Sequence, residues 1–528
     1  MIIVRSLRLE IDEAAERLPF KAAKKLRIGR GDIASWFIVR RSLDARKKND
    51  IHYTYSIAAE VRGDEQKLIA RAKSNDIAQY QPPQYDIPAV AVSDEERPVV
   101  VGFGPAGMFA ALMLARAGAR PVVIERGQAV EQRQKAVDEF RRGGKLNPQS
   151  NVQFGEGGAG TFSDGKLNTG THDRRIFWVL KEFAAHGAPD SVRYDAKPHI
   201  GTDILVDVVK NIRKEIISLG GEVHFETQLV GLVSDEKGLC GAKLRHDGAE
   251  TVLSCRQLIL APGHSARDSF EMLRDFGLNM ERKSFSMGVR IEHLQKDTDI
   301  AQYGTERGGL PAADYSLNVH LPDGTSAYTF CMCPGGQVFA AASEEGGICT
   351  NGMSYSARDG VNSNAALLVT LHTEDFPGDD LLAGMYWQRE IERRAYNCSG
   401  SYRAPAQLVG DFLARRPSTG AADVQPSYEP GVVWCDLHEV LPDRITSVLE
   451  NALPELGKKL RGFDSPDAVM TAPETRSSSP VRILRGESFE SSLPGLYPCG
   501  EGAGYAGGIT SAAVDGLRCA EAVLARLQ

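Results

Sequence analysis

The sequence predicts an α/β protein of several domains, and three observations support that prediction. The chain has 528 residues, more than a single hydrophobic core usually holds. An apolar run at 98–101 leads through a glycine-rich turn into a helical pattern of small residues, which is typical of a parallel strand crossing to a helix. Strand-like and helix-like segments then alternate over 201–263, and a glycine-rich stretch followed by a helical pattern closes the chain.

The composition indicates an ordinary globular protein. Hydrophobic residues make up 42% and charged residues 25% of the chain, and its net charge of −7 gives no argument for nucleic-acid binding by the whole molecule. A run of 18 apolar residues is absent, and acidic residues stand where a signal peptide would have its apolar core. The nine cysteines are scattered without CxxC or zinc spacing. We therefore expect a cytoplasmic protein with reduced thiols, no membrane span and no metal.

Residues 1–80 are predicted to form a small, basic α+β domain. A strand-like stretch at 1–11 and a helical pattern at 12–28 precede two further strands within 35–62. This unit holds 17 Lys and Arg against 11 Asp and Glu, which gives it a charge of +6. Residues 81–97 are rich in proline and polar residues, so we expect a linker there.

A dinucleotide-binding fingerprint follows the linker. Gly102, Gly104 and Gly107 have GxGxxG spacing, with an apolar strand before them and a helix and a second strand after them. The first glycine allows the tight turn, the second lets the backbone approach a pyrophosphate, and the third lets helix and strand pack closely. Glu125 ends the second strand, where a carboxylate binds ribose hydroxyls. The expected cofactor contacts here are Gly102, Gly104, Pro105, Ala106, Gly107, Glu125 and Arg126.

Three further segments favour FAD as the bound dinucleotide. The loop at 154–170 is too rich in glycine for a strand or helix, and a backbone-lined loop suits the isoalloxazine end of FAD. The segment 258–268 is a buried strand ending in a Pro-Gly turn. The segment 497–510 places an acid after a strand and then begins a helix, whose positive end would stabilise a reduced flavin. The expected contacts outside the fingerprint are Gly158, Gly160, Ser163, Asp164, Lys166, Leu229, Ala261, Gly263, Gly500, Glu501, Gly508, Ile509 and Thr510.

Together these segments predict a discontinuous Rossmann-type FAD-binding domain of the kind found in glutathione reductase. Its two parts are expected at 98–285 and 466–528, around an inserted α+β substrate domain at 286–465. A second GxGxxG in a strand–helix frame is missing, as is the CxxxxC pair of the disulfide reductases. If NAD(P)H is a co-substrate, we expect it to dock without a Rossmann domain of its own.

Four polar residues are candidates for catalysis, and each has a structural alternative. Lys166 could tune the flavin or be a surface lysine, and Asp164 could be a site acid or a turn former. His264 could transfer protons or make a structural hydrogen bond. Arg290 could hold an acidic substrate or form an ion pair within a sheet.

Other motifs favour structural roles. For Cys331 and Cys333 packing is favoured over a redox pair, and Arg358 is expected to pair with Asp359 in a turn. The basic and aromatic residues at 40–55 could bind RNA, although a solvated face docked on the acidic remainder explains them too. An RNA-associated flavoprotein is therefore the alternative to an enzyme for small molecules.

Several stretches of the chain match a known group. They include VVVGFGPAGMFAALMLARAG, QFGEGGAGTFSDGKL, LAPGHSARDSFEML, FSMGVRIEH and CMCPGGQVFAAASEEGGICTNGMSYSARDG. Over nearly its whole length the sequence resembles a family of bacterial FAD-dependent or NAD-utilising dehydrogenases, with a distant similarity to flavoenzymes that modify tRNA uridine. The resemblance implies a Rossmann-type FAD domain with an inserted domain and leaves the substrate open. The predicted function is a FAD-dependent oxidoreductase that transfers hydride to or from a small organic substrate.

Overall fold

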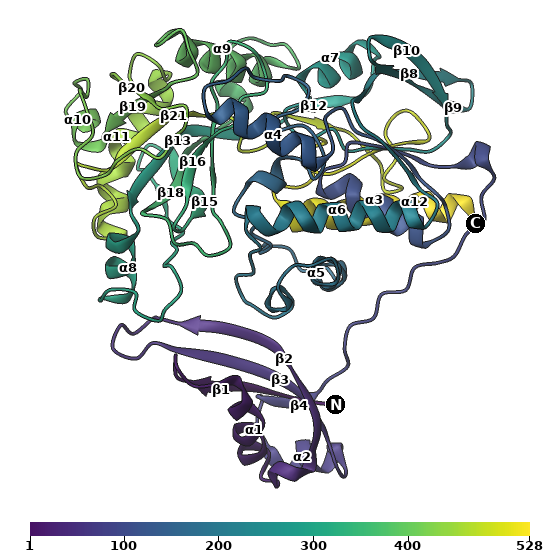
Figure 1. Ribbon diagram of the computed structural model, residues 1–528, viewed down its shortest axis with the longest axis vertical. Helices are drawn as coiled ribbons and strands as arrows, with labels where there is room; N and C mark the ends of the chain where they lie inside the picture. Colours follow the sequence, from purple (N-terminus) through teal and green to yellow (C-terminus); the bar gives the residue numbers. More distant parts are fainter.

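The computed structural model describes residues 1–528 and shows a small N-terminal unit joined to a large body by an extended segment (Figure 1). The elements of the unit are β1 (Ile2–Leu9), α1 (Leu18–Leu26), β2 (Ile33–Asp44), β3 (His52–Val61), α2 (Glu65–Ala72) and β4 (Ile77–Gln79). Its antiparallel sheet has the strand order β2-β3-β1-β4. The apolar faces of β1, β3 and α1 form a core separate from the rest of the molecule.

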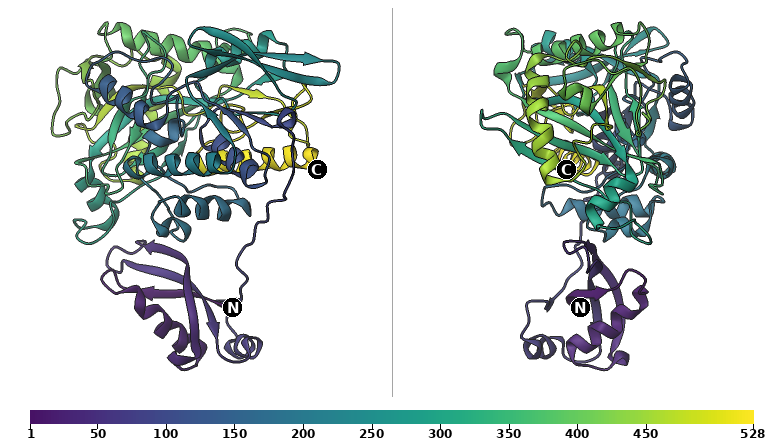
Figure 2. Two further views of the ribbon diagram at one scale, coloured as in Figure 1. Left: turned by 45° about the vertical axis from the view of Figure 1, so that its right-hand side comes forward. Right: turned by 90° about the vertical axis from the view of Figure 1, so that its left-hand side faces the viewer.

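The N-terminal unit reaches the large body by two routes. The extended segment runs alongside the body (Figure 2), where the ring of Tyr85 lies 5.7 Å from that of Trp178. At the edge of the unit's sheet, the Arg41 guanidinium donates to the two carboxylate oxygens of Asp195 at 2.6 and 2.8 Å. Nζ of Lys48 donates to the carbonyl oxygen of Ala301 at 2.8 Å, so two cations of the predicted RNA-binding stretch are engaged within the molecule.

A five-stranded parallel sheet organises the large body. Its strands are β23 (Leu496–Pro498), β11 (Leu258–Leu260), β5 (Val99–Val101), β6 (Val122–Ile124) and β7 (Glu222–His224), in that order. The helices α3 (Pro105–Arg116), α6 (Thr202–Ser218) and α12 (Ile509–Leu527) lie beside one another under it (Figure 1). An antiparallel meander of β8 (Thr227–Asp235), β9 (Gly238–His246) and β10 (Ala249–Ser254) connects β7 to β11. Because β23 comes from the end of the chain, the sheet is discontinuous in sequence.

Close packing of α12 on α3 explains their many small residues. A Cβ on Gly516 would lie 2.0 Å from the carbonyl oxygen of Ala106, so this approach requires a glycine. The helix α3 is buried along almost its whole length. The two helices begin at Pro105 and Ile509, both of which line the same cavity. No helix in the molecule combines the length and apolar character needed to cross a membrane.

The inserted part is built on a seven-stranded sheet of order β14-β15-β18-β13-β21-β19-β20. Its strands are β13 (Phe285–Leu294), β14 (Asn318–His320), β15 (Ser326–Cys333), β18 (Asn362–Leu371), β19 (Ala404–Leu408), β20 (Val432–Trp434) and β21 (Val469–Glu474). The expected boundary at residue 465 falls short of β21, which pairs antiparallel with both β13 and β19. Hydrogen bonding therefore keeps the chain in the insert until about residue 474.

The remaining elements cover these sheets or connect them. Around the parallel sheet lie α4 (Val130–Arg141), α5 (Arg175–Ala185), α7 (Arg267–Asp275), β12 (Met280–Arg282) and β22 (Val481–Ile483). The insert adds α8 (Gln295–Tyr303), β16 (Gln337–Ala340), β17 (Thr350–Met353), α9 (Ala383–Asn397), α10 (Val409–Leu413) and α11 (Asp443–Lys459). Apolar residues of α9 and α11 pack against the seven-stranded sheet in one continuous core.

Candidate functional site

A cavity of about 490 Å³ lies where the carboxyl ends of the parallel strands meet the insert. Four loops of the FAD-binding part line it: the turn after β5, the loop at 153–168, the turn after β11 and the loop at 499–512. Carboxyl ends of parallel strands are the usual ligand site of such folds. All four loops are segments in which the sequence predicted cofactor contacts.

The turn after β5 is shaped by glycines. A Cβ on Gly102, which has φ +92°, would lie 2.0 Å from the carbonyl oxygen of Ala261. A Cβ on Gly107 would lie 1.9 Å from the carbonyl oxygen of Gly102, so Gly107 serves helix packing and does not line the cavity. Gly104 does line it, facing the Cα of Gly158. No side chain caps α3 at Gly104, so the N–H groups of its first turn are free for an anion.

A buried arginine organises the glycine-rich loop at 153–168. Arg133 on α4 is fully buried, and its guanidinium lies over the ring of Phe162. It donates hydrogen bonds to five carbonyl oxygens, those of Asn151, Val152, Gly155, Glu156 and Gly158. The loop has no regular hydrogen-bond ladder of its own, so this side chain replaces one. Arg133 lies outside every motif quoted from the sequence and was missed.

Glu125 is held rigidly at the end of β6. Its Oε2 accepts from the N–H of Phe103 at 2.8 Å, and its Oε1 accepts from the N–H groups of Gly127 and Gly155 at 2.9 and 3.0 Å. Each carboxylate oxygen can accept two hydrogen bonds, so Oε2 keeps one acceptor position for a ribose hydroxyl. The neighbouring Arg126 lines the cavity too, but its guanidinium is paired with Asp268 at 2.9 Å.

The C-terminal loop is fixed by Asp515 on α12. Its Oδ2 accepts from the N–H of Gly500 at 2.8 Å, and its carboxylate pairs with Arg485. Gly508 precedes α12 without a side-chain cap, so a second free helix start faces the cavity. Thr510 does not line the cavity, contrary to expectation, because its hydroxyl is turned to the carbonyl oxygen of Leu167 at 2.7 Å.

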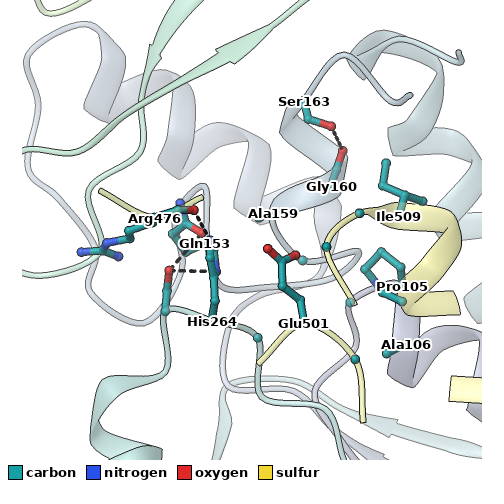
Figure 3. A pocket seen from close by; sticks show the side chains of 18 of the residues that line it. Pro105, Ala106, Gln153, Ala159, Gly160, Ser163, His264, Arg476, Glu501 and Ile509 are labelled. Carbon is teal, nitrogen blue, oxygen red and sulfur yellow. Dashed lines mark hydrogen bonds between the residues drawn. The ribbon is translucent and has the colours of Figure 1, made fainter. Parts of the chain in front are cut away.

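Glu501 occupies the middle of the cavity (Figure 3). Its carboxyl group points between His264 and Arg476 on one side and Pro105 and Ile509 on the other. Burial raises its pKa to about 7, against the lowering effect of a nearby lysine charge. A carboxyl group with this pKa can accept or donate a hydrogen bond near neutral pH.

Two of the catalytic candidates turn out to be paired within the protein. Asp164 forms a buried ion pair with Arg358 of the insert, so the expected turn pair of Arg358 with Asp359 is wrong. Burial opposes ionisation of Asp164, but the charges of Arg358 and Lys166 lower its pKa overall. Arg290 does not line the cavity: it is fully buried beneath it, 3.0 Å from Asn364 and 3.4 Å from Glu474. Arg290 is thus an ion-pair residue of the sheet.

The other two candidates line the cavity. The Nε2–H of His264 donates to the carbonyl oxygen of Arg476 at 2.7 Å, and burial lowers the pKa of the imidazole to about 4. His264 therefore makes the structural hydrogen bond that was the alternative to proton transfer, and burial disfavours its charged form. Lys166 faces the cavity from the glycine-rich loop. The other expected contacts found on the cavity wall are Pro105, Ala106, Gly160, Ser163, Leu229, Ala261, Gly263 and Ile509.

The insert supplies a polar wall that the sequence did not reveal. Its residues on the cavity include Tyr315, Cys331, Asn351, Arg358, Glu474 and Arg476. The Tyr315 hydroxyl and Oε2 of Glu474 are buried polar atoms with no hydrogen-bond partner in the protein. Burial also raises the pKa of Glu474 to about 8. Cys331 lines the cavity as well, whereas Cys333 is fully buried.

The residues present fit FAD. Two uncapped helix starts face one cavity, and glycines leave the space of a side chain beside each. Free N–H groups at helix starts bind pyrophosphate, and Glu125 keeps an acceptor position for a ribose hydroxyl. The cavity then continues to the polar wall of the insert, where a flavin ring and a substrate can meet.

Comparisons with known proteins agree with this geometry. A FAD binding domain family matches residues 97–272, and the C-terminal domain family of FAD-dependent proteins matches residues 284–477. A domain of unknown function matches residues 1–60. An uncharacterised protein of Clostridium beijerinckii is 46% identical over 531 aligned positions, which cover 99% of this chain and 98% of that protein.

Solved flavoprotein structures resemble the chain more distantly. A probable FAD-dependent monooxygenase from Pseudomonas aeruginosa, PqsL, is 14% identical with a TM-score of 0.35, covering 82% of this chain and 87% of its own. A 3-ketosteroid dehydrogenase from Rhodococcus jostii is 12% identical with a TM-score of 0.35, covering 84% and 100%. Likeness of this degree adds nothing to the fold described above.

The identity to the Clostridium protein extends over all three parts of the chain, and both FAD-related families match their expected segments. The chain belongs to the same family as this protein, a family of FAD-dependent proteins that bind FAD in a discontinuous Rossmann-type domain.

Proposed function

We propose that the protein transfers hydride between FAD and a small, polar organic molecule bound between the flavin and the insert. The observation that carries this proposal is the polar wall of the insert, which faces the cofactor loops across the cavity and includes Tyr315, Asn351 and Glu474. Polar groups placed in a largely enclosed cavity fix the orientation of a polar ligand.

The chain's own residues give this wall a chemical role. When bound, FAD supplies the hydride chemistry. Burial raises the pKa of Glu474 to about 8, so its carboxyl group, which lies 3.4 Å from Arg290, can take up and release a proton near neutral pH. Lys166 places a positive charge on the opposite, cofactor-side loop. Phe330 and Met332 add apolar surface to the wall of the insert.

The reductant is tested by anaerobic mixing of the FAD-loaded protein with NADH and, separately, NADPH, followed by a screen of polar acceptors. We expect one nicotinamide to bleach the flavin absorbance and an acceptor to restore it. Glu474→Gln should lower kcat while the flavin content stays unchanged, because the change removes the proton donor and not a cofactor contact. Full turnover by this variant at wild-type kcat, or no reduction by any donor, would contradict the proposal.

The alternative of an RNA-associated flavoprotein has weaker support. Arg41 pairs with Asp195 of the large body and Arg46 with the neighbouring Asp44, which leaves fewer free cations on the basic strand. RNA binding that weakens steeply with salt and disappears on deletion of residues 1–80 would favour it instead.

A further inference from the structure

Two cysteines lie at an irregular point of β15 on the wall of the cavity. The pairing of β15 with β18 shifts by one residue between Phe330 and Cys333, and Cys331 within this bulge has φ +42°. The left-handed region is costly for a residue with a side chain, and such residues gather at functional sites. The bulge brings Cys331 to the cavity, whereas Cys333 is fully buried behind it.

The bulge also turns the second thiol back toward the first cysteine. The S–H of Cys333 donates to the carbonyl oxygen of Cys331 at 3.2 Å. A bulge lets residues with a single residue between them approach more closely than on a regular strand. The pair is therefore arranged so that a small movement of the two side chains would bring the sulfur atoms together.

Positive charges surround the pair. Nη2 of Arg290 lies 3.0 Å from the carbonyl oxygen of Cys331 and 3.7 Å from Sγ of Cys333. The neighbouring Cys333 thiol lowers the pKa of Cys331, and the charges of Arg290 and Lys166 lower it further, against the effect of burial. The thiolate is the reactive form of cysteine, so this environment activates Cys331.

The pair also faces the cofactor side of the cavity. The charge of Cys331 raises the pKa of Glu501, so this thiol lies within electrostatic reach of the acid in the middle of the cavity. Lys166, which acts on the same thiol, belongs to the loop expected at the isoalloxazine ring. Cys331 is thus a thiol on the wall of the cavity that faces the predicted flavin loops.

We propose that Cys331 and Cys333 form a redox-active dithiol that exchanges an electron pair with FAD. On oxidation the two S–H bonds break and one S–S bond forms, which releases two electrons and two protons. Oxidised FAD takes both electrons and one proton, and the second proton leaves to solvent; the reverse reaction reduces the disulfide. The proposal rests on FAD binding but not on the small organic substrate proposed above, so either can fail alone.

The test counts electrons. Air-oxidised, FAD-loaded protein is titrated with dithionite under argon, after removal of all added thiols. We expect the wild type to take up about four electrons per FAD, two for the ring and two for the disulfide. Cys331→Ser and Cys333→Ser should each take up about two, with unchanged flavin content.

A second pair of neighbouring cysteines serves as the matched control. Cys398 and Cys435 affect one another's pKa in the insert but do not line the cavity. Cys398→Ser should therefore keep the four-electron uptake. In the oxidised wild type, the peptide with residues 331 and 333 should resist alkylation and be lighter by two hydrogens.

Two results would overturn the proposal. One is a two-electron uptake by the oxidised wild type with both Cys331 and Cys333 fully alkylated. The other is loss of the extra electrons in Cys398→Ser and not in Cys331→Ser. If a serine variant loses FAD, the peptide masses of the wild type alone decide between a disulfide and free thiols at these positions.

Discussion

At the scale of single residues, the site is set by partners far away in sequence. The GxGxxG spacing was predictable because the turn and the start of α3 lie within a few residues of one another. The roles of Asp164, His264 and Arg290 were not, because their partners Arg358, Arg476 and Glu474 lie 184 to 212 residues away. The sequence shows which side chains can ionise, but only the fold shows what each one faces.

Glu474 gives a prediction for the pH dependence of stability. Its pKa is raised by burial to about 8, so between its ordinary value and pH 8 the folded chain holds a proton that the unfolded chain has released. The stability that this bound proton contributes is complete at acid pH and is lost as the pH rises through 8. The loss is about 1.4 kcal/mol for each unit by which the pKa is raised. We expect Glu474→Gln, which stays neutral, to gain Tm relative to the wild type between pH 6 and pH 9, on the order of a few degrees.

The control is Glu487→Gln, a change at an exposed carboxylate close by in the chain. Its Tm should follow the wild type across the same range. Parallel curves for the wild type and Glu474→Gln would show that Glu474 ionises normally in the fold.

At the scale of elements, loops rather than strands define the cavity. The short parallel strands were predictable from apolar runs bounded by glycine and proline, and the glycine-rich loops from composition. The bulge in β15 and the hydrogen bonds from Arg133 to its loop were not predictable, because neither has a local sequence signal. The predicted end of the insert came too early in the chain for the same reason. The strand β21 belongs to the insert because it pairs with β13 and β19, which are distant in sequence.

Arg133→Met tests the loop as an element. The change leaves five carbonyl oxygens without their donor, so we expect a loss on the order of 3 kcal/mol in the free energy of unfolding in urea. FAD affinity, measured by flavin fluorescence, should fall at least tenfold because the loop lines the cofactor cavity. Arg142→Met, at an exposed position just after the same helix, should change neither quantity. Wild-type FAD affinity in Arg133→Met would mean that the loop holds its shape unaided.

At the scale of the whole molecule, a buried charge network locks the insert to the FAD-binding part. Arg267 at the start of α7 and Arg476 after β21 both donate to Glu392 on α9, at distances of 2.7 to 2.9 Å. All three side chains are almost completely buried. The overall plan of a discontinuous FAD domain around an insert was predictable from the order of motifs, but this interface joins residues that no motif connects.

Glu392→Gln tests that interface. Burial disfavours the charged carboxylate, but the charges of Arg267 and Arg476 lower the pKa of Glu392 overall, so its stabilising effect is present at neutral pH and fades as pH falls through acid values. Removing this charge leaves the buried Arg476 without a carboxylate partner and Arg267 with Glu344 alone, and we expect a loss of about 3–5 kcal/mol at pH 7 by urea unfolding. Glu390→Gln, on the exposed face of the same helix, should cost under about 0.5 kcal/mol. Equal stability of the two variants would mean that the network does not hold the parts together.

The flavin content of the purified chain tests the central claim that this cavity holds FAD. The protein should be yellow and should release about one FAD per chain on denaturation, as expected for a single dinucleotide fold. Gly104→Val should fold but lack flavin, because its side chain would occupy the pyrophosphate space beside Gly158, whereas Gly420→Val, where a Cβ meets open space, should load normally. Colourless wild-type protein that takes up no added FAD, or a Gly104→Val variant with full flavin content, would contradict the account.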